Sequence, residues 1–248
     1  MKFIRILHAD WMKTKHTAIR LIAYITPIAY SIIMIMYNKH NKLQIQNYAT
    51  FFNAMAIILP LGIALLSTQI CQQEENAGSF NGLLSIPASR ASIYMSKLIM
   101  IILIIAIDIL VSTIIMIVGS KFILHLEFVN CSLFILGALL MIFGSIVICS
   151  FDLLISLRFG MGASIGIGSL GVLIVAIVGL TPVGDSFWQF VLWTFQARLS
   201  ELPGLFMPGA NIPINATPSQ YFYEQIKRGT WSVIIFSILI TLLGVIWF

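Results

Sequence analysis

Charged residues are scarce in this sequence. Only 9% of its 248 residues are Asp, Glu, Lys or Arg, whereas 59% are hydrophobic. Soluble domains carry roughly a quarter charged residues, so a soluble fold of this length has no means of burying so much apolar surface. The apolar residues form runs of about 20, each long enough for a helix to cross a hydrocarbon core of ~30 Å. The sequence therefore predicts an all-α integral membrane protein.

Signatures of catalysis and of bound cofactors are also missing. The sequence has no G-x-x-x-x-G-K-[ST] loop, so the chain is not itself an ATPase. Its three cysteines, Cys71, Cys131 and Cys149, are odd in number and have no metal-ligand spacing. One acid at mid-depth and no convincing repeat argue against a proton-coupled secondary transporter. We expect no enzyme activity, no metal and no cofactor on this chain.

Two glycine motifs in the fifth apolar run imitate enzyme signatures. "GASIG" fits G-x-S-x-G around Ser164, but that motif needs a strand, a sharp turn and a histidine base. "GIGSLG" fits G-x-G-x-x-G, which needs a βαβ unit that an apolar span cannot supply. Gly162 and Gly166 are four residues apart, the spacing that lets helices approach closely in lipid. We interpret these glycines as packing residues, against a helix of this chain or of a second one.

The apolar runs predict six spans, with both termini in the cytoplasm. We place the spans at about residues 17–36, 51–70, 98–119, 131–157, 162–180 and 230–248. Basic residues are concentrated before or just inside the first span, at Lys2, Arg5, Lys13, Lys15 and Arg20. Because basic residues favour the cytoplasmic side, this asymmetry sets the predicted orientation. Trp231 and Trp247 mark the two ends of the predicted sixth span.

The residues before the first span have an amphipathic pattern. In residues 1–16, an apolar helical face would carry Phe3, Ile4, Leu7 and Trp11, with the charges largely elsewhere. Such a segment can lie flat on an anionic inner leaflet. We expect an in-plane cytoplasmic helix here, with an ordinary charged leader to the first span as the alternative.

A polar stretch, residues 71–97, separates the second and third spans and forms the first cytoplasmic loop. Glu74 and Glu75 follow span two, and Phe80, Leu83 and Leu84 belong to a short apolar set that Pro87 ends. A short amphipathic helix of this kind can dock in a groove of a partner protein. It can equally pack on the membrane surface, and the pattern alone leaves both open.

Three stretches resemble one known family. They are "AGSFNGLLSIPASRASIYMSK", preceded by acids, the segment 157–200, which begins "LRFGMGASIG", and the opening "FIRILHADWMKTKHTAIR". Together they resemble type-2 ABC exporter permeases, and more narrowly the lantibiotic-immunity permeases of Gram-positive bacteria. The resemblance covers most of the chain.

The resemblance implies a function and a set of partners. Six-helix permeases of this family pair as homodimers or heterodimers. Each binds a cytoplasmic ATPase, which holds ATP and Mg, through a coupling helix in the first loop. The complex removes a lantibiotic peptide from the producer's own membrane and so confers self-immunity. Carried over to this sequence, the ATPase-facing region comprises Glu74, Glu75, Gly78, Phe80, Leu83, Leu84, Pro87 and Arg90. Export of another amphipathic peptide or antibiotic, or a non-transporting scaffold or sensor role, are the alternatives.

One acid lies inside a predicted span. Asp108 is near the middle of span three, where a carboxylate costs roughly 2.5–3.5 kcal/mol and should avoid lipid. It could belong to a substrate path or a proton site. Alternatively, it forms a structural hydrogen bond with a facing Ser, Thr or Tyr.

The largest segment outside the spans, residues 181–229, is predicted to lie on the outer side. Its first part is dense in aromatic residues, which suits a helix lying in the membrane interface. Its second part is rich in Pro, Gly and Asn and is therefore loop-like. A cationic peptide arriving from outside would meet this surface first, so Trp188 and Trp193 are candidate substrate contacts. An interfacial lid without a ligand role is the alternative.

Overall fold

The fold is described from a computed structural model that covers residues 7, 11–12, 18–41, 43–76, 89–126, 129–210 and 217–248, without the side chains of 18–22 and 76. Within these ranges every regular element is a helix and there is no strand, which confirms the all-α prediction. Four helices in them are long and apolar enough to cross a membrane: 44–75, 90–122, 131–179 and 218–247.

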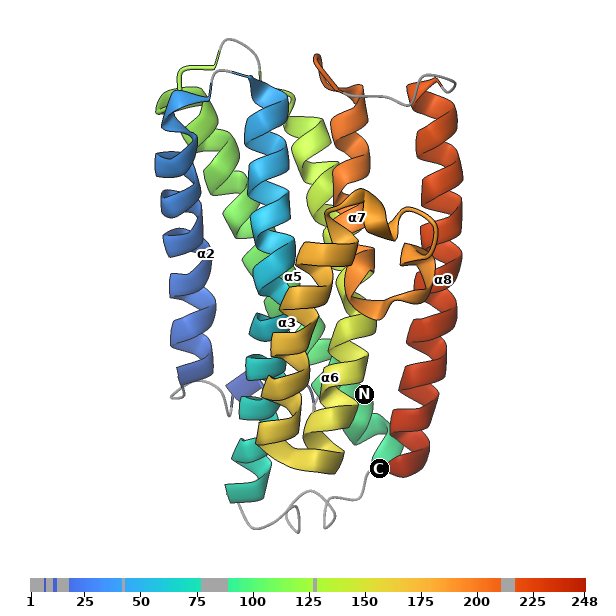
Figure 1. Ribbon diagram of the computed structural model, residues 1–248. Coiled ribbons are helices and arrows are strands. Elements are labelled where there is room, and N and C mark those ends of the chain that lie inside the picture. Colours follow the sequence, from blue (N-terminus) through green and yellow to red (C-terminus); the bar gives the residue numbers. More distant parts are fainter. Residues whose placement is uncertain are drawn as a thin grey trace.

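The long helices stand side by side in an upright bundle (Figure 1). They are α2 (Ala18–Tyr37), α3 (Gln44–Asn76), α5 (Arg90–Phe122), α6 (Cys131–Ile174) and α8 (Pro218–Trp247). We call the end at which α3 and α8 finish and α5 begins the lower end, as it is drawn in Figure 1. The helices α2, α3 and α5 alternate in direction, and α8 runs downward like α3 (Figure 1).

The helix α6 reverses direction at Gly160. Its backbone there has φ 78° and ψ −170°, a conformation open almost only to glycine. The hydroxyl of Ser156 donates to that of Ser164 over 2.9 Å, whereas a straight helix would separate residues eight apart by ~12 Å. Figure 1 shows the first arm, residues 131–159, descending and the second arm, residues 161–174, rising again. The two arms correspond to the predicted spans 131–157 and 162–180.

The two arms of α6 enclose α3. In lipid, helix association depends on close packing and hydrogen bonds, because lipid tails are as apolar as leucine. Against the first arm, Tyr48 packs on Phe134 with ring centroids 5.0 Å apart. Against the second arm, a Cβ atom at Gly168 would lie 2.5 Å from the Ala64 side chain, so only glycine fits. Tyr48 and Phe134 belong to the main hydrophobic core.

The chain that follows α6 folds back against the bundle. A π-helical turn, Val175–Gly179, leads into short 3-10 turns, the helix α7 (Phe195–Glu201) and a further 3-10 turn, Leu202–Phe206. A Cβ atom at Gly144 in α6 would lie 2.6 Å from the Gln196 nitrogen, so α7 touches α6 backbone to backbone. Figure 1 shows α7 between the long helices, well below the upper end of α8.

A proline in α3 helps to hold this segment. Pro60 has no N–H, so the Ala56 carbonyl loses its partner within the helix. The Gln196 amide donates to that carbonyl over 3.3 Å. The aromatic residues before α7 form the 3-10 turns Trp188–Phe190 and Leu192–Thr194 in place of the single interfacial helix that we expected.

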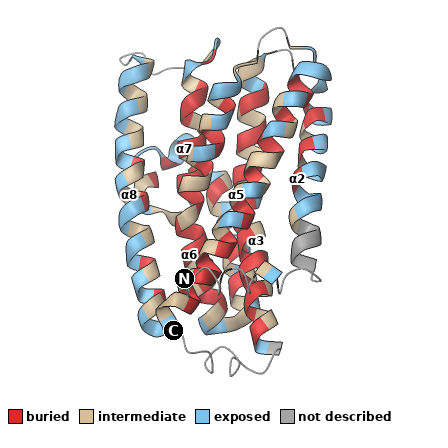
Figure 2. Ribbon diagram, turned by 180° about the vertical axis from the view of Figure 1, so that it is seen from behind, coloured by how far each residue is buried: buried red, intermediate tan, exposed pale blue. Residues whose placement is uncertain are grey.

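The last helix is longer than the predicted span 230–248. It begins at Pro218, because the Thr217 hydroxyl caps it and accepts a hydrogen bond from the Gln220 N–H. Trp231 therefore lies within the helix, well after its first residue, and its side chain is exposed. Figure 2 shows that the outward faces of α2 and α8 are largely exposed. Those faces carry large apolar side chains, which suits contact with lipid.

Replacement of Gly160 by Ala should destabilise the protein by about 1–3 kcal/mol, because a Cβ atom is strained in this backbone conformation. The measurement is the thermal unfolding midpoint in detergent. Gly162→Ala is the matched control, since a Cβ atom there meets nothing within 4 Å. Equal midpoints for the two variants would contradict the role of Gly160 in the reversal.

Candidate functional site

A buried ion pair joins the helices on either side of the predicted coupling loop. The Lys97 ammonium lies 2.9 Å from the Glu74 carboxylate, and the two side chains are 2% and 8% exposed. Glu74 is near the end of α3 and Lys97 is near the start of α5. Removing one partner of a buried pair typically costs 3–5 kcal/mol, so the pair fastens the two helix ends together.

The predicted ATPase-facing residues have different environments. Glu75 and Arg90 are exposed at the lower end. The Arg90 guanidinium also donates to the Phe248 carbonyl over 3.3 Å, which ties the start of α5 to the end of α8. Glu74 is buried against Lys97 and is not displayed to a partner in this conformation. The remaining predicted residues lie outside the described part of the chain: Gly78, Phe80, Leu83, Leu84 and Pro87.

A polar cavity of about 200 Å³ lies beside this end, between α3 and the reversal of α6. Glu75, Arg158 and Gly160 help to line it. Sequence reasoning missed both this cavity and the role of Lys97. The available signal was a lysine at the start of an apolar run, "MSKLIMII", but nothing in the pattern indicated its partner.

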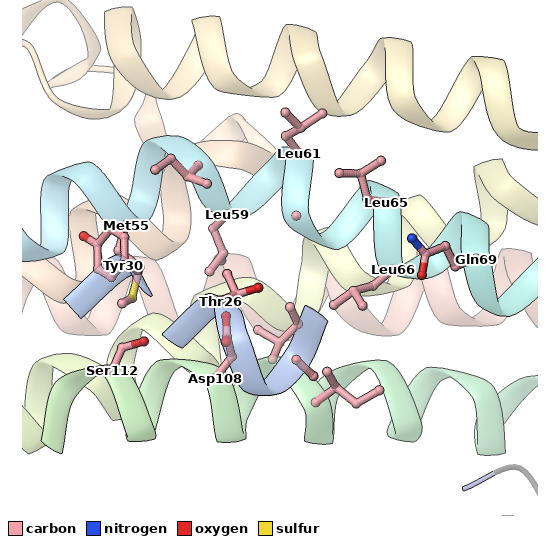
Figure 3. A pocket seen from close by; sticks show the side chains of 15 residues that line it. Thr26, Tyr30, Met55, Leu59, Leu61, Leu65, Leu66, Gln69, Asp108 and Ser112 are labelled. Carbon is pink, nitrogen blue, oxygen red and sulfur yellow. The ribbon is translucent and has the colours of Figure 1, made fainter. Parts of the chain in front are cut away.

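A second cavity, of about 270 Å³, lies among α2, α3 and α5 in the apolar part of the bundle. Figure 3 shows Asp108 extending from α5 into this cavity, toward Thr26 of α2 and Leu59 of α3. The Asp108 Oδ1 atom is buried and has no hydrogen-bond partner among the described residues. Two hydroxyls that line the cavity bond elsewhere, because Tyr30 donates to the Phe51 carbonyl and Ser112 to the Pro27 carbonyl. We therefore find no structural bond from either hydroxyl to Asp108.

A third cavity, of about 460 Å³, lies between α7 and α8. Arg198 donates to the Asp185 carboxylate over 2.7 Å and to the carbonyls of Val178 and Thr181. Glu201 also lines this cavity. Burial raises the pKa of Glu201 from 4.5 to about 7, although Arg198 and a hydrogen bond from Asn53 both act to lower it.

Of the two candidate substrate-contacting tryptophans, Trp188 is buried and Trp193 is partly buried. Trp188 is 5% exposed, lines the third cavity and packs edge-on against Phe195 with ring centroids 6.3 Å apart. Trp193 packs edge-on against Phe151 with centroids 5.7 Å apart. A ligand would thus reach Trp188 only through the third cavity.

The comparison with known proteins identifies the family. A family model described as ABC-2 family transporter protein matches residues 6–179, well over half of the chain. The chain belongs to the ABC-2 transporter family. It is therefore a multi-pass membrane permease subunit, of the kind that pairs with an ATPase subunit. No curated protein matches it.

In this ABC-2 permease the later glycines of the second α6 arm pack closely within the chain: a Cβ atom at Gly168 or Gly171 would lie 2.5 Å from the side chain of Ala64 or Trp193. Ser164 is buried, accepts from Ser156 and donates to the Ala64 carbonyl over 3.4 Å. Gly162 and Gly166 are exposed, and a Cβ atom at either would meet nothing within 4 Å. The expected close neighbour of these two glycines is thus absent from the described residues of this chain.

The stability of the ABC-2 permease should depend on pH through Glu201. Because its folded-state pKa is raised to about 7, the folded protein binds this proton more tightly than the unfolded chain. The stabilisation from protonation is present at low pH and is lost as pH rises through about 7. Relative to Glu201→Gln, the wild-type unfolding midpoint in detergent should therefore fall between pH 5 and pH 8.

The control for this measurement is Glu224→Gln, which changes an exposed acid on α8. It should follow the wild-type pH profile. Parallel profiles for wild type and Glu201→Gln would show that the Glu201 carboxyl is not stabilised in its protonated form by the fold.

Proposed function

We propose that this ABC-2 permease is the membrane subunit of an ATP-driven exporter that removes a lantibiotic peptide from the producer's own membrane. The observation that carries the proposal is the family match over residues 6–179, which includes the segments flanking the loop. The sequence resemblance to lantibiotic-immunity permeases supplies the substrate class. No covalent chemistry takes place on this chain in the proposal, since ATP and Mg bind to the partner ATPase.

The proposed topology has six crossings, formed by α2, α3, α5, the two arms of α6 and α8. The lower end faces the cytoplasm, in keeping with the basic residues before the first span. In this orientation the loop between α3 and α5 meets the ATPase, and the cavity between α7 and α8 lies toward the outer side. Residues 1–16 are largely outside the described part of the chain, although Leu7 and Trp11 pack against the main core.

The proposed coupling runs through the two helix ends that flank the loop. ATP binding closes the ATPase pair and displaces the loop. Because Lys97 and Glu74 are joined by a buried ion pair, α3 and α5 move together when the loop is pushed. The two arms of α6 pack on α3, so the movement also reaches the half of the bundle that holds α7.

The proposed exporter contains two permease subunits. Gly162 and Gly166 leave an exposed strip on the second α6 arm with the small-xxx-small spacing that favours close helix contact. This strip supports a contact with a second permease, identical or different.

The test of the proposed function is lantibiotic sensitivity in a naive Gram-positive host. The host carries this permease with the ATPase and permease encoded beside it, and the control set has a catalytically dead ATPase. Protection only with the live ATPase is the expected result. Equal protection from both sets would indicate sequestration or a scaffold role, and no protection against several lantibiotics would redirect the search to other amphipathic peptides.

The coupling contact gives a separate prediction. Glu75→Lys should lower recovery of the ATPase in detergent pull-downs several-fold, because it reverses the charge of an exposed residue beside the loop. The permease itself should insert and unfold as the wild type does. Glu224→Lys is the matched control, an exposed acid on α8 far from the lower end, and should leave recovery unchanged. Normal recovery with Glu75→Lys would place the ATPase contact elsewhere.

A further inference from the structure

We infer that the cavity among α2, α3 and α5 binds a primary ammonium group carried by an amphiphile dissolved in the membrane, with the Asp108 carboxylate as its counter-ion. The inference rests on the proposed function for its biological meaning, since it specifies how a cationic amphipathic substrate is recognised. The binding site itself rests on the geometry of the cavity.

The buried polar atoms of the cavity that have no partner among the described residues are hydrogen-bond acceptors. The Asp108 Oδ1 atom and the Gln69 Oε1 atom are both buried and unpartnered among the described residues. The hydroxyls of Tyr30 and Ser112 already donate to main-chain carbonyls. A ligand that brings donors would satisfy these buried acceptors, and an ammonium group brings three donors and no acceptor.

The described residues that line the cavity include no cation. In the described ranges, the ion pairs between side chains are Lys97–Glu74 and Arg198–Asp185, and neither involves Asp108. A carboxylate in the middle of an apolar helix is expensive unless a partner compensates it. An ammonium group supplied by a ligand would be such a partner, and charge-assisted hydrogen bonds are the stronger ones.

The remaining walls suit an apolar body attached to the ammonium group. They are aliphatic for the most part and include Ile104 and Ile105 of α5, with Leu59 and Leu66 of α3 (Figure 3). A volume of about 270 Å³ accommodates an alkyl chain or a lysine side chain with part of its neighbour. Gln69 lies farther along α3 from Asp108 in Figure 3 and offers a second acceptor to a longer ligand.

The cavity opens sideways onto the surface that faces lipid. Ile58 and Leu65 line it and are 52% and 40% exposed, and Thr26 on α2 is exposed as well. The helix α2 packs mainly on α5 and touches α3 little, which leaves the α2–α3 side open. An amphiphile in the bilayer can enter by this side without crossing the polar ends of the bundle.

The first experiment is photolabelling of the full-length permease in phosphatidylcholine nanodiscs. The probe is a diazirine-bearing dodecylamine, compared with the matching dodecanol. Peptide mapping should place the amine on α2, α3 and α5, with labelling about tenfold above that by the alcohol, as one charge-assisted bond predicts. Equal labelling by amine and alcohol would overturn the inference.

Three variants distinguish the contribution of the Asp108 carboxylate to labelling from the contribution of the cavity volume. Asp108→Asn should reduce amine labelling to the level of the alcohol, and Gly62→Leu should reduce labelling by both probes. Gly62 lines the cavity and a Cβ atom there meets nothing within 4 Å, so a leucine side chain has room to begin at this wall and takes up cavity volume while Asp108 stays. Asp152→Asn is the control, because Asp152 is another buried, unpartnered acid and does not line the cavity. Unchanged labelling with Asp108→Asn would overturn the inference.

Competition identifies the source of the ammonium group. A lysine-rich amphipathic peptide that displaces the probe supports a peptide substrate, and phosphatidylethanolamine that displaces it supports a lipid headgroup. Displacement by neither would show that the site does not accept membrane-borne amines in general and would overturn the inference. Labelling needs no ATPase, so its failure is distinct from a failure of the protection test.

Discussion

The reversal of α6 at Gly160 is the constraint on which the rest of the structure depends. Lipid gives helices little hydrophobic reason to associate, so they must meet through close packing and hydrogen bonds. The turn at Gly160 returns the second arm to α3, where Gly168 lies against Ala64 and Ser164 donates to the Ala64 carbonyl. The rising second arm also carries the chain back to the segment around α7. That segment and α8 pack on the first arm, where Val147 shares one hydrophobic cluster with Phe195 of α7 and Val233 of α8.

The few polar side chains in the bundle fall into two groups. One group is matched within the chain: Lys97 pairs with Glu74, and Gln196 takes the carbonyl that Pro60 leaves free. The other group, which includes Asp108, keeps buried acceptors without a partner in the described chain. Matched groups hold helices in place. We propose that the acceptors of the α2–α3–α5 cavity are matched by a ligand.

Hydropathy predicted the bounds of a helix well where the apolar run is as long as the helix itself. The residues predicted as a span at 17–36 form the helix α2, Ala18–Tyr37, although α2 is not among the four described helices that are long and apolar enough to cross a membrane. Hydropathy was less accurate for the first residues of α3 and α8, because these helices begin at Gln44 and Pro218, before the apolar runs. The reason is that main-chain hydrogen bonds and caps continue a helix through polar residues, whereas hydropathy reports only the stretch that suits lipid.

The sequence by itself determined the class of protein, because its apolar runs and scarce charges permit only a membrane bundle, and it marked Asp108 as an acid at mid-span. It could not say that Glu74 is buried while Glu75 is exposed, since adjacent helical residues point about 100° apart and only the neighbours decide which face is covered. Tertiary structure alone decided the pairing of polar groups. Lys97 and Glu74 are 23 residues apart and Gln196 and Ala56 are 140 apart, and such partners meet only when whole helices pack.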